Sequence, residues 1–455
     1  MQVTMYDNYY FIGIGGIGMS ALARYFKYIG KNVSGYDRTP SHLTAQLESE
    51  GIMVHYEDRP DLVPINVEKT FVIYTPAIPE ELQELQYVRQ RGYSLCKRSR
   101  ALGQIAADKD CLAVSGTHGK TTTSTMLAHI FTSATENGCT AFLGGISKNY
   151  HTNLLMSRSD VLVAEADEFD RSFLQLRPKI AVVTAIDADH LDIYGTHEAV
   201  KEAFASFASQ VAADGYVVAK LGVDLHTDNV KARILNYSYD TPCDFYASDI
   251  KPLKGGHFSF TLNYPGGKVT GCTVGIPGWV NVENAVAASA VALLYGVEPE
   301  RIKGAIATFS GVERRFDIHI NTDRIAYVDD YAHHPAEIAS AISSIREIFP
   351  GRKLCGIFQP HLYTRTRDFA DEFAAALSKL DTLIMLPIYP ARELPIEGVS
   401  SEMILDKVTI PDKCLVPKDK LMETILSRDT DCLITFGAGD IDRFVPQIEE
   451  ALKNV

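Results

Sequence analysis

The sequence predicts an α/β protein of three domains, each built on a mainly parallel sheet with helices on its faces. The chain has 455 residues, enough for two to four domains at about 100–200 residues each. Short β-branched runs alternate with longer helical stretches nearly throughout, as in parallel sheets. Two glycine-rich turns, at 13–18 and 116–119, each follow a predicted strand and precede a predicted helix.

The first domain is expected over residues 1–109, with a Rossmann-like arrangement. Strands are predicted at 9–15, 32–37 and 69–78, and a helix at 19–30. A polar break at 107–110 separates this domain from the next.

The second domain is expected over residues 110–312, as a central sheet resembling those of phosphate-loop ATPases. Its predicted strands are 111–116, 160–168 and 179–190, and a helix follows at 281–296. Short alternating runs broken by Gly and Pro predict an antiparallel patch within 230–275. The third domain, 313–455, is again Rossmann-like, with strands predicted at 325–331, 353–359, 382–389 and 431–439.

Composition excludes several classes of protein. The net charge of −13 argues against a nucleic-acid binder, which is more often basic. The longest nearly apolar run, 285–295, is too short to insert across a membrane, and the N-terminus lacks an export pattern. Eight cysteines without a C-x-x-C pair argue against a zinc site or disulfide framework. We therefore expect a cytoplasmic protein.

The N-terminal turn "GIGGIG" places Gly13, Gly15 and Gly18 in G-x-G-x-x-G spacing. Such glycines allow a tight turn and the close approach of a diphosphate to a helix N-terminus. Asp37 ends the next predicted strand, where an acidic residue can bond a ribose hydroxyl. NAD, FAD or a UDP-sugar would all fit, and a merely tight turn is the alternative.

The second turn, "GTHGKT", resembles a phosphate-binding loop but departs from G-x-x-x-x-G-K-[ST], because Val114 stands where the first glycine belongs. Backbone N–H groups of such a loop can cradle phosphates. Lys120 can neutralise phosphate charge, and the Thr121 hydroxyl can bind Mg²⁺. The pattern predicts a nucleotide site; His118 has no expected role beyond filling the turn.

Two acidic clusters follow predicted strands of the second domain: Glu165, Asp167 and Glu168, and then Asp187, Asp189, His190 and Asp192. Ligands collect at the carboxyl ends of parallel strands, and Mg²⁺ prefers oxygen ligands. The clusters predict a magnesium site. Helix caps and turns are the alternative interpretation.

Polar groups at three further places are candidate ligand contacts. Asn281 and Asn284 have a spacing of three, so both can face one ligand, although a helix N-cap is the alternative. Arg314 and Arg315 stand at the boundary of the second and third domains, where a guanidinium can bind phosphate or form a surface salt bridge. The third domain offers a set at one sheet edge: Asp329, Asp330, His333, His334, His361, Arg365 and Arg367.

At these motifs the sequence resembles the Mur ligases of bacterial cell-wall synthesis, over essentially its whole length. The matching stretches are "FIGIGGIGMSALA", "GTHGKTTT", "VAEADEFDRSF", "DADHLDIY", "GVERRFD", "VDDYAHHP", "FQPHLYTRTRDF" and "YPARE". The shortened phosphate loop is that family's form. The N-terminal glycine turn and "FQPHLYTRTRDF" favour the branch that adds L-alanine.

The resemblance implies a UDP-sugar-binding domain, a central ATP-binding domain and a C-terminal domain that closes over the site. It implies ATP-dependent formation of an amide between UDP-N-acetylmuramate and L-alanine through an acyl phosphate, with Mg²⁺, by a monomer or homodimer. The nearest rival is a ligase that joins the same UDP-sugar to a tripeptide. A Rossmann oxidoreductase and a non-catalytic nucleotide switch are rivals from other classes.

The resemblance also implies residue roles. Lys120, Glu165, His190 and Arg315 would be catalytic, and Thr121, Glu165 and His190 would hold Mg²⁺. The ATP-binding set would be Gly116, Thr117, His118, Gly119, Lys120, Thr121, Thr122, Asn281, Asn284, Arg315 and Asp330. The UDP-sugar set would be Gly13, Gly15, Gly16, Gly18, Ser20, Asp37, His334, Arg365 and Arg367. The sequence departs from the family at Val280, where histidine is common, and Lys201 cannot be placed as a carbamylated lysine.

Overall fold

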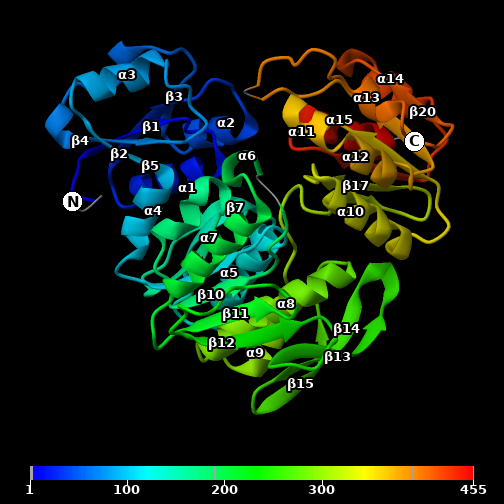
Figure 1. Ribbon diagram of the computed structural model, residues 1–455, viewed down its shortest axis with the longest axis horizontal. Helices are drawn as coiled ribbons and strands as arrows, with labels where there is room; N and C mark the ends of the chain where they lie inside the picture. Colours follow the sequence, from blue (N-terminus) through cyan, green and yellow to red (C-terminus); the bar gives the residue numbers. More distant parts are fainter. Residues whose placement is uncertain (1–3, 189–190, 392, 454–455) are drawn as a thin grey trace. The chain divides into compact units, whose positions relative to one another are not determined.

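The computed structural model describes residues 4–188, 191–391 and 393–453. By contacts within the chain, these residues form two compact units: 1–252 with 257–311, and 253–256 with 312–455. The fold class is confirmed as a three-domain α/β protein with mostly parallel sheets, while the predicted boundaries at 109/110 and 312/313 stay predictions (Figure 1). No helix within the described ranges is both long and apolar enough to span a bilayer.

The N-terminal sheet has five parallel strands in the order β3-β2-β1-β4-β5. Its buried strand residues, such as Phe11 and Ile73, pack against helix residues such as Phe26. The glycine turn lies between β1 and α1, as the sequence predicts. The elements are β1 (Asn8–Ile12), α1 (Ile17–Tyr28), β2 (Asn32–Tyr36), α2 (His42–Ser49), β3 (Met53–His55), β4 (Thr70–Tyr74), α3 (Gln83–Gln90), β5 (Ser94–Lys97) and α4 (Arg98–Ala106).

The central sheet has ten strands in the order β15-β14-β13-β12-β11-β10-β6-β9-β7-β8. Its middle is parallel, and β13, β14 and β15 pair antiparallel at one end, which confirms the predicted patch. The strands are β6 (Asp110–Ser115), β7 (Thr140–Ser147), β8 (Thr152–Leu155), β9 (Val161–Glu165), β10 (Ile180–Val183), β11 (Tyr216–Lys220), β12 (Arg233–Ser238), β13 (Phe245–Pro252), β14 (Phe258–Tyr264) and β15 (Gly267–Thr273).

Helices cover the central sheet on its two faces. α5 and α8 pack against each other, and Phe173 stacks on Phe207, joining η3 to α7. Most residues of α8 are buried, as expected for a helix that is apolar on most of its surface. The elements are α5 (Lys120–Ala134), η3 (Phe169–Gln175), α6 (Leu191–Tyr194), α7 (His197–Ser209), α8 (Trp279–Leu294) and α9 (Pro299–Ala307).

The C-terminal sheet has six strands in the order β16-β17-β21-β18-β19-β20, with only β16 antiparallel to its neighbour. Two apolar clusters cover its faces, one around Phe358 and one around Tyr327. The elements are β16 (Asp317–Asn321), β17 (Ala326–Asp330), α10 (Pro335–Ile348), β18 (Leu354–Phe358), α11 (Tyr363–Asp368), α12 (Ala370–Leu377), β19 (Thr382–Met385), α13 (Glu402–Leu405), β20 (Lys413–Leu415), α14 (Leu421–Leu426), β21 (Cys432–Phe436) and α15 (Val445–Lys453).

A buried polar cluster joins α1 to β8 in the first unit. Asn153, fully buried, donates from Nδ2 to the Ile17 carbonyl at 2.6 Å and to Ser20 Oγ at 2.9 Å. Its Oδ1 accepts from Arg24 Nη1. Because Ile17 begins α1, this cluster fixes the helix whose first turn carries the glycine loop.

We expect Asn153→Ala to lower the free energy of unfolding of this unit by about 2–3 kcal/mol, because it leaves buried donors and acceptors unsatisfied. The measurement is urea denaturation followed by the fluorescence of Trp279, the single tryptophan, which lies in the same unit.

The matched control is Asn229→Ala, an exposed asparagine in a loop, for which we expect a change within about 0.5 kcal/mol. Equal stabilities of the two variants would contradict the role given to Asn153.

Candidate active site

The phosphate loop connects β6 to α5 and is fastened to the end of β10. Gly116 has a φ of +131°, and a Cβ there would lie 2.0 Å from Thr184 Oγ1. Gly119, at φ +78°, ends the loop as the N-cap of α5. The Thr117 N–H donates to the Ala185 carbonyl at 3.0 Å. Both glycines are therefore required by backbone conformation, and the shortened loop still delivers Lys120 to the start of a helix.

His118 has a partner that the sequence did not reveal. Its Nε2 lies 3.2 Å from Asp187 Oδ2, which also accepts from Thr117 Oγ1 at 3.2 Å. The hydrogen bond from His118 holds the pKa of Asp187 below its usual range. His118 thus anchors the loop to the residue that follows β10 by four positions.

Lys120 and Glu168 form a largely buried ion pair. Lys120 Nζ lies 2.8 Å from Glu168 Oε1 and donates to the Gly116 carbonyl at 2.6 Å. Burial opposes the charge of Lys120, but the carboxylates of Glu168, Asp167 and Glu165 outweigh it and raise the pKa of this lysine. The lysine is therefore charged, and it sits inside its own loop.

Glu165 and Thr121 offer oxygen atoms that suit Mg²⁺. Glu165 ends β9, and its carboxylate lies so close to Gly144 that a Cβ there would be 2.2 Å from Oε2. Thr121 is buried in the first turn of α5. Among the described residues, no group of three or more His, Cys, Asp or Glu side chains is arranged so that it could hold a metal ion. His190, with Asp189, lies outside the described residues.

Asn281 and Asn284 lie in the first turns of α8, and both are buried. Asn281 Nδ2 donates to the Pro277 carbonyl at 2.6 Å, and Asn284 Nδ2 donates to Asn281 Oδ1 at 3.1 Å. Asn284 Oδ1 accepts from Thr123 Oγ1 at 3.2 Å. The N-cap interpretation is wrong, since Gly278 is the N-cap. The two asparagines instead tie α8 to the helix of the phosphate loop.

The glycines of the N-terminal turn each meet a different constraint. Gly13 has a φ of +87°. The Gly15 N–H donates to Asp37 Oδ2 at 2.8 Å, and a Cβ on Gly15 would lie at the same distance from that oxygen. Gly16 is the N-cap of α1. Asp37 is thereby held against the glycine turn at the end of β2.

Gly18 leaves room for a charged side chain. A Cβ at Gly18 would lie 2.7 Å from Arg98 Nη1 and 3.0 Å from Arg98 Cδ. Arg98 begins α4, and its Nη2 lies 3.5 Å from Asp167 Oδ2. A guanidinium therefore bridges the glycine turn of one sheet and the acidic loop of another.

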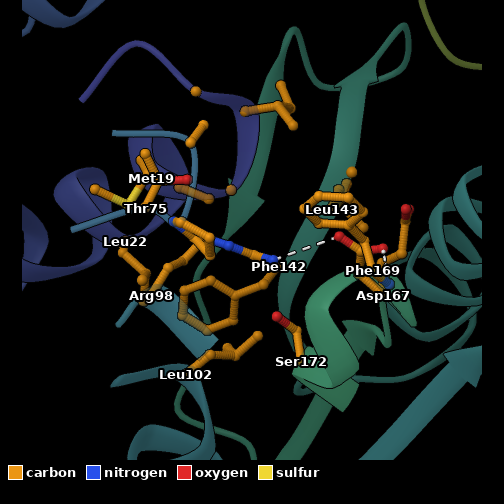
Figure 2. A pocket seen from close by; sticks show the side chains of 18 residues that line it. Met19, Leu22, Thr75, Arg98, Leu102, Phe142, Leu143, Asp167, Phe169 and Ser172 are labelled. Atoms are coloured by element: carbon orange, nitrogen blue, oxygen red, sulfur yellow. Dashed lines mark hydrogen bonds and ion pairs between the residues drawn. The ribbon is translucent and has the colours of Figure 1, made fainter. Parts of the chain in front are cut away.

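A cavity of about 250 Å³ joins these two places within the first unit. Figure 2 shows Met19 and Thr75 on one side, Asp167 and Phe169 on the other, and Arg98 extending toward Asp167. The side chains of Phe142 and Leu102 form an apolar part of the cavity wall. The lining also includes Gly16, Gly18, Gly144 and Glu165. The predicted UDP-sugar turn and a predicted metal ligand thus face one space.

Ser20 does not line this cavity. It is fully buried, donates to the Ile17 carbonyl at 2.9 Å and accepts from Asn153. The structure places it in the buried α1–β8 cluster.

The remaining predicted residues lie in the second unit. Asp330 accepts from the Phe316 N–H at 2.9 Å and from the Ala332 N–H at 2.7 Å, and burial raises its pKa to about 7 despite the opposing charge of Arg315. The Arg315 guanidinium lies 4.9 Å from the ring centre of Tyr331. Asp330 thus holds the turn that carries Arg315.

Histidines and arginines gather near the start of α10 in the same unit. His334 is the N-cap of that helix, and its ring lies 4.9 Å from that of Phe369. The pKa of His333 is lowered to about 4, chiefly by burial, with the charge of Arg365 adding to the effect. Arg367 is exposed and paired with its neighbour Asp368 at 2.7 Å. Arg365 and the histidines therefore share one environment, while Arg367 points to solvent.

Sequence reasoning missed Gly144 and Thr184 as members of the site, and it offered Arg98 only as part of a local concentration of positive charge that could meet an anionic ligand. That concentration consists of Lys97, Arg98 and Arg100, for which a solvated surface face is the alternative interpretation. The proximity of Arg98 to Gly18 depends on how α4 packs beside α1, for which the sequence holds no signal.

Family comparisons cover nearly the whole chain. Residues 8–110 match the description "Mur ligase family, catalytic domain", residues 114–292 match "Mur ligase middle domain", and residues 314–439 match "Mur ligase, glutamate ligase domain".

Named relatives agree with these matches. The chain is 50% identical to the UDP-N-acetylmuramate–L-alanine ligase of Parabacteroides distasonis, covering 99% of this chain and 98% of the relative. It is 48% identical to that of Porphyromonas gingivalis, covering 98% and 99%. The crystal structure of the corresponding Thermotoga maritima ligase superposes with a TM-score of 0.82 at 27% identity, covering 98% and 99%. The chain belongs to the Mur ligase family.

Proposed function

We propose that this chain uses ATP to join the carboxylate of UDP-N-acetylmuramate to the amine of L-alanine, a step in peptidoglycan precursor synthesis. ATP transfers its γ-phosphoryl group to a carboxylate oxygen, which gives an acyl phosphate and ADP. The amine of alanine then attacks the carbonyl carbon, and phosphate leaves as the amide forms.

The cavity is the observation that carries this proposal. It is lined by Gly16 and Gly18 of the glycine turn and by Glu165 and Asp167 beside the phosphate loop. A UDP-sugar held at the turn would therefore extend its sugar toward the site of phosphoryl transfer. An oxidoreductase would need the glycine turn but would leave the phosphate loop and these carboxylates without a use.

We assign the ATP phosphates to the loop of Gly116, Thr117, His118 and Gly119 with Lys120, Thr121 and Thr122. Loop N–H groups at a helix N-terminus favour anions. To bind a phosphate, Lys120 Nζ exchanges its bond to the Gly116 carbonyl for phosphate oxygen. Asn281 and Asn284 lie beside this helix, which supports their assignment to the adenine.

We assign Mg²⁺ to Thr121 and Glu165, with His190 as a further ligand. The ion would neutralise charge between the carboxylate and the γ-phosphate, two anions that repel by roughly 4 kcal/mol at 4 Å and an effective dielectric of 20. Glu165 faces both the cavity and Lys120, which supports its place in this set.

Arg315 and Asp330 are assigned to ATP, and His334, Arg365 and Arg367 to the sugar–carboxylate and alanine region, on the family resemblance. Gly13, Gly15, Ser20 and Asp37 complete the UDP-sugar assignment, and the bonds of Ser20 within the α1–β8 cluster support a role in holding α1 for this ligand. All eight cysteines are unpaired, which supports a cytoplasmic location. The proposed assembly is a monomer or homodimer.

Phosphate release with a panel of acceptors tests the function. With ATP and UDP-N-acetylmuramate present, we expect release to require L-alanine and to be at least tenfold less efficient, by kcat/KM, with glycine, L-serine or the tripeptide L-alanyl-γ-D-glutamyl-meso-diaminopimelate. Preference for the tripeptide would instead support the ligase type named for the structurally similar UDP-N-acetylmuramate:L-alanyl-γ-D-glutamyl-meso-diaminopimelate ligase of Neisseria meningitides. Release independent of any acceptor would support a nucleotide switch.

Lys120 allows activity and stability to be separated. Lys120→Met should abolish ligation and also destabilise the unit by about 3–5 kcal/mol, because the partner carboxylate of Glu168 stays buried without a cation. The double variant Lys120→Met, Glu168→Gln removes both charges and should recover most of the stability, yet no activity. Thermal unfolding and coupled phosphate release measure the two effects. Activity in the double variant would refute the role of Lys120.

Gly144 tests the metal assignment without removing a ligand. Gly144→Ala places a methyl group against the Glu165 carboxylate, so the Mg²⁺ concentration for half-maximal phosphate release should rise at least tenfold. Gly304→Ala, on the open face of α9, is the control and should leave this concentration unchanged. An unchanged Mg²⁺ dependence in Gly144→Ala would count against Glu165 as a metal ligand.

A further inference from the structure

Arg98 is the one arginine among the cavity-lining residues, and it stands between the two halves of the site. Its side chain is 20% exposed, with Nη1 against Gly18 and Nη2 3.5 Å from Asp167 Oδ2. Figure 2 shows the side chain running through the space bounded by Phe142, Leu102 and Thr75. The guanidinium is therefore in the cavity rather than on the outer surface.

Fold stability does not account for this position. The ion pair with Asp167 is long and partly exposed, and such pairs add little to stability. Arg98 is also the first residue of α4, whose first turn holds no acidic residue. A positive charge there is disfavoured by the helix dipole. An arginine at this place is better explained by an anion that enters the cavity.

The proposed reaction places an anion here. The carboxylate of UDP-N-acetylmuramate must lie beyond the glycine turn, near Glu165 and the phosphate loop. Lys120 is paired with Glu168 and is assigned to the phosphates of the nucleotide, so a different cation is needed for this carboxylate. A guanidinium offers two parallel N–H groups that match a carboxylate, and Asp167 already shows that a carboxylate can meet Arg98 from this direction.

We propose that Arg98 binds the lactyl carboxylate of UDP-N-acetylmuramate and orients it for phosphorylation, with Asp167 holding the guanidinium in position. The inference rests on the proposed function and names a binding residue for the same site. Gly18 is required for this arrangement, because any side chain at that position would collide with the guanidinium of Arg98.

The comparison of two UDP-sugars separates this carboxylate from the diphosphate. UDP-N-acetylglucosamine carries the diphosphate but lacks the lactyl carboxylate. By titration calorimetry, Arg98→Ala should bind UDP-N-acetylmuramate about 10- to 100-fold more weakly, as expected for loss of a charge-assisted bond. Its affinity for UDP-N-acetylglucosamine should change less than twofold, as should the KM for ATP.

Arg98→Lys keeps the charge but loses the paired N–H groups. Its affinity for UDP-N-acetylmuramate should therefore fall less than that of Arg98→Ala, and its affinity for UDP-N-acetylglucosamine should again be unchanged. Arg100→Ala removes the same charge from an exposed position of α4 that does not line the cavity, and should bind both sugars as the unaltered protein does. A thermal unfolding curve for each variant confirms that it is folded.

Three results for Arg98→Ala would overturn the inference. Equal loss of affinity for both UDP-sugars would assign Arg98 to the diphosphate, and a higher KM for L-alanine with unchanged affinity for UDP-N-acetylmuramate would assign it to the carboxylate of the amino acid. No change in either affinity or in this KM would leave Arg98 without a role in binding. The proposed function is tested separately by assaying ligation with the unaltered protein, because that result does not depend on the outcome for the Arg98 variants.

Discussion

The buried ion pair between Lys120 and Glu168 is the interaction on which the candidate site depends. Lys120 begins the helix after the phosphate loop, and Glu168 follows the neighbouring strand β9, so the pair fixes two strand ends against each other. Desolvating either charge alone costs several kcal/mol, and only the partner offsets that cost. The same pair holds Glu165 and Asp167 beside the loop. The placement of a metal ligand and of the cavity wall thus follows from one contact between a loop lysine and a glutamate.

Glycines set the second constraint, by letting charged groups approach the backbone. Gly18 admits the guanidinium of Arg98, and Gly144 admits the carboxylate of Glu165. Both charged groups line the same cavity. A Cβ would lie only 2.7 Å from the Arg98 guanidinium at Gly18 and 2.2 Å from the Glu165 carboxylate at Gly144, so a side chain at either position would displace the charged group. Charge-assisted binding is sensitive to such displacements. The glycine turn is therefore a packing requirement for a charged neighbour as well as a place for a diphosphate.

Much of the site could be predicted from the sequence, because its signals are local. The loop "GTHGKT", the acidic residues Glu165 at the end of β9 and Asp187 after β10, and the fold class depend on residues close together in the chain. The alternation of the patch at 230–275 is also visible directly in the sequence. The pairing of His118 with Asp187 could not be predicted, since it depends on the register of β6 beside β10. For Arg98 the sequence offers only a basic group, Lys97, Arg98 and Arg100, that could meet an anion or face solvent; its position in the cavity could not be predicted, because it is set by helix packing.

The polar groups of this site already have partners within the protein, and this bears on how it selects ligands. Lys120 bonds the Gly116 carbonyl, Asn284 accepts from Thr123, and Arg98 pairs with Asp167. A ligand must either replace such a bond, as a phosphate would replace the Gly116 carbonyl at Lys120, or add to it, as a carboxylate would join Asp167 at Arg98. The net free energy of binding is therefore the difference between the new and the old contacts. An anionic oxygen restores a charge-assisted bond to each cation, whereas a neutral ligand of the same shape would leave a buried cation poorly paired, at a cost of about 1–3 kcal/mol or more. The site thus prefers ligands with phosphate or carboxylate groups largely because a ligand without these groups leaves the cations of the site poorly paired. Other sites that are built to bond a specific polar group discriminate in the same way.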